Sequence, residues 1–184
     1  MFDEFLYNLY RAIRLDKNLY RDPKTFENIS FLFAGLIIII NGFAGLVAQK
    51  TFLETLKTVY GFTNFTETSF IGIVLSALLG WFVWSTLIYI IGAKLFSEKN
   101  TVTSFKNVMI LVGYGHSPGL FRFFAIIPDL LLLVIFITEI WIFLSIAVGL
   151  KEILNFKSNL KSLGVVIIAF LIILISFAYF SNSI

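Results

Sequence analysis

Three polar side chains lie near the centres of separate apolar stretches of the sequence. Asn41, His116 and Glu139 each stand within a few residues of the middle of a run that is dominated by Ile, Leu, Phe and Val. Inside a membrane, these three side chains can meet at one depth. A carboxylate there costs about 2.5–3.5 kcal/mol on insertion scales, so we expect Glu139 to face the bundle interior and to be protonated or paired. His116 is its first expected partner and Arg122 the second.

This polar cluster fits two kinds of site. An ionisable pair at the membrane midplane, beside a helix broken by Gly115 and Pro118, resembles the proton or cation sites of transporters. The same side chains can instead form hydrogen bonds between helices, which stabilise packing by about 0.6–2 kcal/mol each. The structural interpretation is favoured because Ser117 or His116 can satisfy the backbone carbonyls that the proline leaves without a donor.

The sequence shows no pattern of a known enzyme site. The H-E-x-x-H, G-x-S-x-G and P-loop motifs are all absent, and no two carboxylates share a helical face within the apolar stretches. There is no cysteine, which excludes thiol catalysis and Cys-based metal sites, and His116 is the only histidine. We therefore expect a non-enzymatic protein with no catalytic residue, no cofactor and no metal.

The composition places these residues in a membrane protein. Of the 184 residues, 59% are hydrophobic and 14% are charged, whereas an ordinary soluble domain has roughly 25% charged residues. Such an apolar excess requires a lipid environment. The basic residues that give the net charge of +3 are spread between apolar runs, so we expect no nucleic-acid partner.

Five stretches are apolar over about the 20 residues that a membrane helix needs. The predicted spans are 30–49, 69–92, 107–127, 130–150 and 163–181. The third is interrupted by Gly113, Gly115 and Pro118, which predicts a broken helix. The expected fold is all-α and polytopic, with a cytoplasmic segment at residues 1–29 and a five-helix transmembrane domain at 30–184.

The N-terminal segment has the pattern of an amphipathic helix on the membrane surface. Its apolar residues recur at helical spacing, and its polar residues Asp3, Glu4, Asn8, Arg11 and Arg14 occupy the other face. The apolar face is formed by Phe2, Phe5, Leu6, Leu9, Tyr10 and Ile13. Asp22-Pro23 breaks this helix, and Thr25 is expected to be the N-cap of the next helix or a polar residue near its start.

The distribution of positive charge predicts the orientation in the membrane. If all five stretches cross, eleven Lys and Arg residues fall on the side of the N-terminus and three on the other side. The positive-inside rule then gives a cytoplasmic N-terminus and an external C-terminus. Basic loop residues such as Lys94, Lys99 and Lys151 would face anionic lipid, which attracts each by about 1 kcal/mol. Membrane lipids, anionic ones included, are expected partners.

A row of small residues in the second span predicts close helix packing. Gly72, Ser76 and Gly80 repeat at intervals of four, followed by Trp84. Such a row favours contact with another helix, either in this chain, in a second copy or in a partner membrane protein. Trp81, Trp84 and Trp141 lie near span centres, where we expect them to fill the bundle.

Several short motifs occur in an order that resembles the Ypt-interacting-protein (Yip) domain family. A Pro-x-Thr-Phe lead-in at Pro23–Phe26 precedes the first span. The third span carries Gly113-Tyr114-Gly115-His116-Ser117-Pro118, and Trp141, Gly149, Leu150 and Glu152 close the fourth. The resemblance covers roughly residues 15–181 and implies five spans, a cytosolic N-terminus and motif residues at Gly113, Tyr114, Pro118, Trp141, Gly149 and Glu152.

The resemblance also implies a kind of function. Eukaryotic Yip-domain proteins look like trafficking factors that contact Rab-type GTPases at the Golgi and endoplasmic reticulum. This chain lacks the Asp-Leu-Tyr-Gly-Pro element and has only about 29 residues before the first span, which disfavours GTPase binding. A short chain rich in Ile, Phe, Asn and Lys looks more like the bacterial and archaeal members, and the expected location is then the cytoplasmic membrane. The expected function is contact with lipid or protein, as an adaptor or accessory subunit, and the alternative is a small transporter or channel component.

Overall fold

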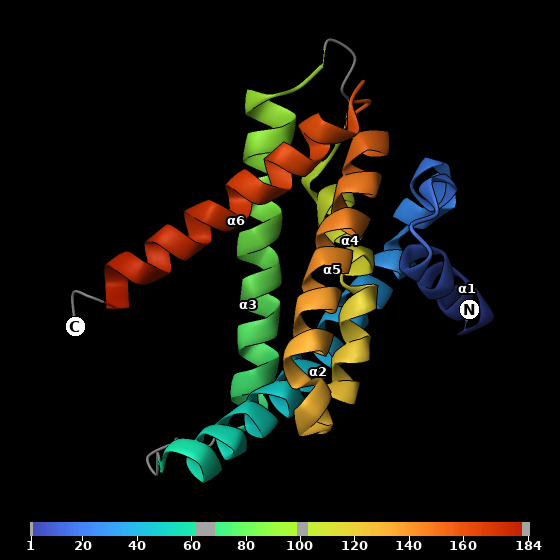
Figure 1. Cartoon of the computed structure of the whole chain (residues 1–184). Coiled ribbons are helices and arrows are strands. Elements are labelled where there is room, and N and C mark those ends of the chain that lie inside the picture. The colour runs from blue at the N-terminus through green and yellow to red at the C-terminus, as the bar shows by residue number, and fades with distance from the viewer. Residues whose placement is uncertain (1, 62–68, 99–102, 182–184) are drawn as a thin grey trace.

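The computed structural model describes residues 2–61, 69–98 and 103–181 (Figure 1). Helices account for 88% of it, and the described residues include no strand, so the expected all-α fold is confirmed. Lys99 lies outside the described residues. The helices are α1 Phe2–Ile13, η1 Lys17–Arg21, η2 Pro23–Phe26, α2 Asn28–Tyr60, α3 Phe70–Ile88, η3 Tyr89–Leu95, α4 Phe105–Gly115, η4 Ser117–Ile126, η5 Pro128–Leu130, α5 Leu131–Ile153 and α6 Asn159–Ser181.

Four helical stretches are long and apolar enough to cross a membrane, which makes this an integral membrane protein. They are Asn28–Val59, Phe70–Leu95, Pro128–Ile153 and Asn159–Ser176. The remaining expected span, 107–127, is divided between α4 and η4, of 11 and 10 residues. Neither piece alone has the length of about 17–25 residues that crosses a bilayer, so the count of five spans stays a prediction.

The division of this third stretch follows from its sequence. The α-helix ends at Gly115, with His116 as its C-cap, and Pro118 near the start of η4 has no N–H to continue the α-helical ladder. Residues 108–115 are all buried, since α4 contacts α2, α3 and α5. The short helix α4 therefore lies at the centre of the bundle.

The helices form a tilted bundle that opens toward one end. In Figure 1, α3, α4 and α5 run side by side, whereas the C-terminal parts of α2 and α6 lean away from them. Polar contacts gather several helix ends at the opposite end. Lys106 at the start of α4 donates to Asn28 at the start of α2 at 2.6 Å, and Lys161 near the start of α6 pairs with Glu98 at 2.7 Å.

The N-terminal segment packs against the bundle, and its faces differ from the expected ones. Helix α1 buries Phe5, Asn8 and Ala12, whereas Leu6 and Tyr10 of the expected apolar face are exposed. Asn8 was expected on the polar face. The reason is that α1 contacts α4 and η4 through a narrow stripe of residues spaced by three and four, which leaves the aromatic side available to lipid.

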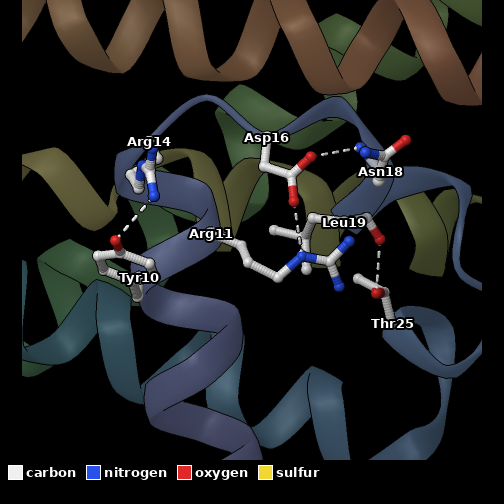
Figure 2. Close-up of polar contacts among 7 residues, drawn as sticks. All are labelled: Tyr10, Arg11, Arg14, Asp16, Asn18, Leu19 and Thr25. Atoms are coloured by element: carbon white, nitrogen blue, oxygen red, sulfur yellow. Dashed lines mark hydrogen bonds and ion pairs between the residues drawn. The ribbon is translucent and has the colours of Figure 1, made fainter.

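The chain then turns twice before α2 begins. Leu15, two residues after the end of α1, has a positive φ of 58°. Asp16 then accepts hydrogen bonds from the Arg11 side chain and the Asn18 backbone at 2.8 and 2.9 Å (Figure 2). Thr25 is not the N-cap of the first span. It lies inside η2, where its hydroxyl donates to the Leu19 carbonyl at 2.6 Å, and Glu27 precedes α2 with no side-chain cap.

Candidate intramembrane polar site

An ion pair between η4 and α5 is the centre of the candidate site. The guanidinium of Arg122 donates from Nη2 to Glu139 Oε1, and its Nε donates to the Thr138 hydroxyl at 3.4 Å. The expected first partner of Glu139, His116, is therefore the wrong one, and Arg122 takes its place. The Glu139 side chain is 47% exposed against 15% for Arg122. Contrary to expectation, Glu139 lies at an edge of the bundle and not in its interior.

His116 is engaged with its own helix. Its Nδ1 lies 2.7 Å from the carbonyl oxygen of Val112, one turn earlier. This carbonyl, in the last turn of α4, also accepts from the His116 backbone N–H at 3.2 Å. In the tautomer that donates from Nδ1, the other ring nitrogen, Nε2, is an acceptor.

A groove of about 340 Å³ brings Asn41, His116 and Arg122 together. We call it the polar groove, and it is lined by Ile38, Asn41, Gly42, Gly45, Ser76, Ala77, Gly80, Trp81, Trp84, His116, Arg122 and Ile173. Asn41 is 8% exposed, and its Oδ1 has no hydrogen-bond partner in the described part of the chain. Gly119 is the neighbour that makes room for it, because a Cβ there would collide with Oδ1.

A second cleft opens on the other side of Arg122. This Glu139 cleft has a volume of about 250 Å³ and is lined by Gly45, Ala48, Gln49, Phe52, Arg122, Ile135 and Glu139. Arg122 and Gly45 line both the groove and the cleft. Of the expected polar cluster, Asn41 and His116 therefore share one groove, and Glu139 is joined to them through Arg122.

The small residues of α3 face the polar groove. Ser76 and Gly80 are exposed and line it, and a Cβ on Gly80 would meet no atom within 4 Å. Gly72, the third member of the row, is half-buried. The close approach of α2 and α3 is made instead by Ala77, whose Cβ lies 3.0 Å from the Cβ position of Gly42.

The motif residues of the third stretch pack the centre of the bundle. A Cβ on Gly113 would lie 2.9 Å from the Cα of Ala34, so glycine is needed where α4 crosses α2. Tyr114 is fully buried, and its hydroxyl has no partner among the described residues. Pro118 is buried at the start of η4.

The motif residues of α5 hold the N-terminal segment in place. The Trp141 indole donates to the Ile13 carbonyl at 2.9 Å, and Glu152 pairs with Arg21 at 2.6 Å. Tyr20 lies over Gly149, where a Cβ would approach its ring to 2.9 Å. This burial raises the pKa of the Tyr20 hydroxyl. Motif and N-terminal segment thus form one structural unit.

Sequence reasoning missed Ser145, which belongs to the same unit. Its hydroxyl donates to the Ala12 carbonyl at 3.3 Å. A signal was available, because Trp141, Ser145, Gly149 and Glu152 follow one another at helical spacings of four, four and three and so share one face of α5. Ala12 and Ile13 lie in the last turn of α1, whose carbonyls lack intrahelical donors.

The order of these motifs has a counterpart among known families. A family model described as the Yip1 domain matches residues 17–180. The chain belongs to the Yip1 domain family. No curated protein and no solved structure matches the chain. The Yip1 domain match begins at Lys17, the first residue of η1, and includes all of α2 to α5.

The Yip1 domain offers polar groups for recognition. The groove presents donors on Arg122 and an acceptor on one nitrogen of His116. Two further polar atoms of its lining residues, Trp84 Nε1 and Asn41 Oδ1, are buried without a partner in the described residues. No group of three or more His, Cys, Asp or Glu that could hold a metal ion occurs in the described residues. Such a set suits hydrogen bonding to another membrane component.

Proposed function

We propose that this Yip1-domain protein is non-enzymatic and acts by contact within the membrane, as an adaptor or accessory subunit of a membrane complex. The observation that carries the proposal is the half-exposed Glu139 carboxylate, paired with Arg122 at the edge of the bundle. Hydrocarbon chains form no hydrogen bonds, so an ion pair that opens sideways favours a neighbour that covers it.

The shape of the two openings supports a transmembrane segment as that neighbour. Small residues on α2 and α3, namely Gly45, Ser76 and Gly80, allow a helix backbone to approach closely. The guanidinium of Arg122, which lines both openings and is 15% exposed, supplies donors for such a segment. A partner segment that crosses Gly45 would touch both the polar groove and the Glu139 cleft.

Filling Gly45 tests this proposal directly. A Cβ at Gly45 meets nothing within 4 Å, so Gly45→Leu should fold while it blocks both openings. We expect proteins that co-purify with the wild type in mild detergent to fall at least about ten-fold in abundance, which corresponds to about 1.4 kcal/mol. The matched control is Gly164→Leu on α6, where a Cβ also meets nothing within 4 Å.

Each outcome of this purification has a distinct meaning. Loss of a partner in Gly45→Leu but not in Gly164→Leu supports the adaptor proposal. A second copy of the chain as the lost component identifies the complex as a homo-oligomer. Wild-type protein that carries only lipid, or equal partner recovery in both variants, contradicts it. A Rab-type GTPase among the retained proteins would overturn the expectation that none binds.

The alternative proposal is a small transporter or channel component. It is favoured by one specific observation, which is that Arg122 separates two openings and pairs with a carboxylate at mid-span. In reconstituted vesicles, Glu139→Gln should then abolish ion or proton flux while protein incorporation stays equal to that of the wild type. Absence of flux in the wild type removes this alternative.

A further inference from the structure

A basic pocket lies where the N-terminal segment meets the end of α5. It has a volume of about 280 Å³ and is separate from the polar groove. Lys17 and Arg21 come from η1, and Lys151 comes from the last turn of α5. Two segments more than 100 positions apart in the sequence therefore contribute positive charge to one cavity.

The charges of the pocket are only partly neutralised. Among the described residues that line it, Glu152 is the one acidic side chain, and it pairs with the Nε of Arg21 at 2.6 Å. Within the described part of the chain, the ammonium groups of Lys17 and Lys151 take part in no ion pair. Three cations and one carboxylate leave an excess of positive charge that attracts an anion.

The backbone at the end of α5 is arranged so that it does not repel an anion. A helix C-terminus carries partial negative charge on its free carbonyls. Here the Lys151 carbonyl accepts from the Phe156 N–H at 3.0 Å and the Glu152 carbonyl from the Asn155 N–H at 3.3 Å. Asn155 makes this turn with a positive φ of 53°, and Phe156 is buried beneath the pocket at 3% exposure.

We infer that this pocket binds the phosphate of an anionic membrane phospholipid and that the bound phosphate ties η1 to α5. The pocket lies at the end of the candidate span Pro128–Ile153, whose last turn contributes Lys151 and Glu152 to it, and this position corresponds to the depth of the headgroups. This inference rests on the proposed function and specifies a lipid among its contacts.

The test titrates phosphatidylglycerol into the purified full-length protein and measures bound lipid by native mass spectrometry. Lys17→Ser combined with Lys151→Ser should weaken binding about twenty-five-fold, because each basic residue near an anionic headgroup contributes about five-fold. Hydrogen exchange of residues 14–26 should slow on addition of the lipid in the wild type only. The matched control is Lys24→Ser with Lys157→Ser, two exposed lysines at the same end that do not line the pocket.

Three results would overturn the inference. One is equal loss of phosphatidylglycerol in the pocket pair and in the control pair, which would indicate a general surface-charge effect. Another is equal binding of phosphatidylcholine. The third is slowing of exchange by inorganic phosphate alone, which would indicate a soluble ligand. Partner recovery with the pocket pair is measured in parallel, because its retention while lipid binding fails separates this inference from the adaptor proposal.

Discussion

The indole N–H of Trp141, at the middle of α5, donates to the carbonyl of Ile13 at the last residue of α1, 2.9 Å away. The bond joins residues 128 positions apart. It supplies a donor to a helix end that has none of its own and an acceptor to an indole in an apolar region. Trp141 thus attaches the N-terminal segment to the middle of α5 by a specific hydrogen bond.

Removing the indole N–H of Trp141 should weaken the attachment of the N-terminal segment to α5 while an aromatic ring still fills the space. Trp141→Phe keeps a ring that can stack on Phe121, at a centroid distance of 5.5 Å in the wild type, but removes the N–H. Loss of one such bond costs about 1 kcal/mol, so hydrogen exchange of residues 2–26 should accelerate about five-fold. Trp84→Phe is the control, since Trp84 Nε1 has no partner in the described residues, and equal rates in both variants would contradict the assignment.

A single methyl group on Gly149 should displace η1 from α5. The added Cβ would lie 2.9 Å from the Tyr20 ring and 3.0 Å from a methyl of Leu111, both closer than van der Waals contact. We expect Gly149→Ala to lower the free energy of unfolding by about 1–3 kcal/mol, as overpacking does. Gly164→Ala in α6, where nothing lies within 4 Å of the new Cβ, should not lower it, since alanine favours the helix. The free energies come from unfolding in mixed micelles, and equal values would refute close packing at Gly149.

The main helices could be predicted because membrane solubility imposes a simple pattern. Apolar runs of about 20 residues identified α2, α3, α5 and α6, and the Gly115 to Pro118 interval identified the break after α4. The Yip resemblance was also accessible, since it depends on the order of motifs. These features depend on local sequence and not on which helices touch.

The side-chain contacts between helices could not be predicted from the sequence, and the reason is physical. The 3₁₀ turns of η4 advance about 2.0 Å and 120° per residue, so the facing of Arg122 toward Glu139 depends on where the α-helix stops. An uninterrupted α-helix would have placed Arg122 on another face. Asn8 is buried for a similar reason, because the chain folds back at Leu15 and brings α1 onto α4.

Protonation of Asp16 in acid should destabilise the turn that follows α1. The hydrogen bond from Arg11 holds the pKa of this carboxyl below its usual value of 3.8, with the Asn18 backbone N–H adding to the effect. The stabilisation is complete above that usual value and disappears as the pH falls through the lower folded pKa. Hydrogen exchange of residues 2–26, corrected for intrinsic rate, should therefore rise in strongly acidic solution. Asp16→Asn should lack this dependence, and an identical profile in both proteins would exclude Asp16 as the cause.

The Arg122–Glu139 pair should show strong and unequal coupling. In Glu139→Leu, a guanidinium that is 15% exposed loses its counter-ion and cannot shed its proton, so we expect a loss of about 3 kcal/mol in the free energy of unfolding. Arg122→Leu should cost less, because a carboxyl group, unlike a guanidinium, can exist without a charge. The double variant removes both charges and should be more stable than Glu139→Leu alone. Unfolding in mixed micelles measures all three, and if the two single losses simply add in the double variant, the pair contributes no coupling and the partner site loses its electrostatic basis.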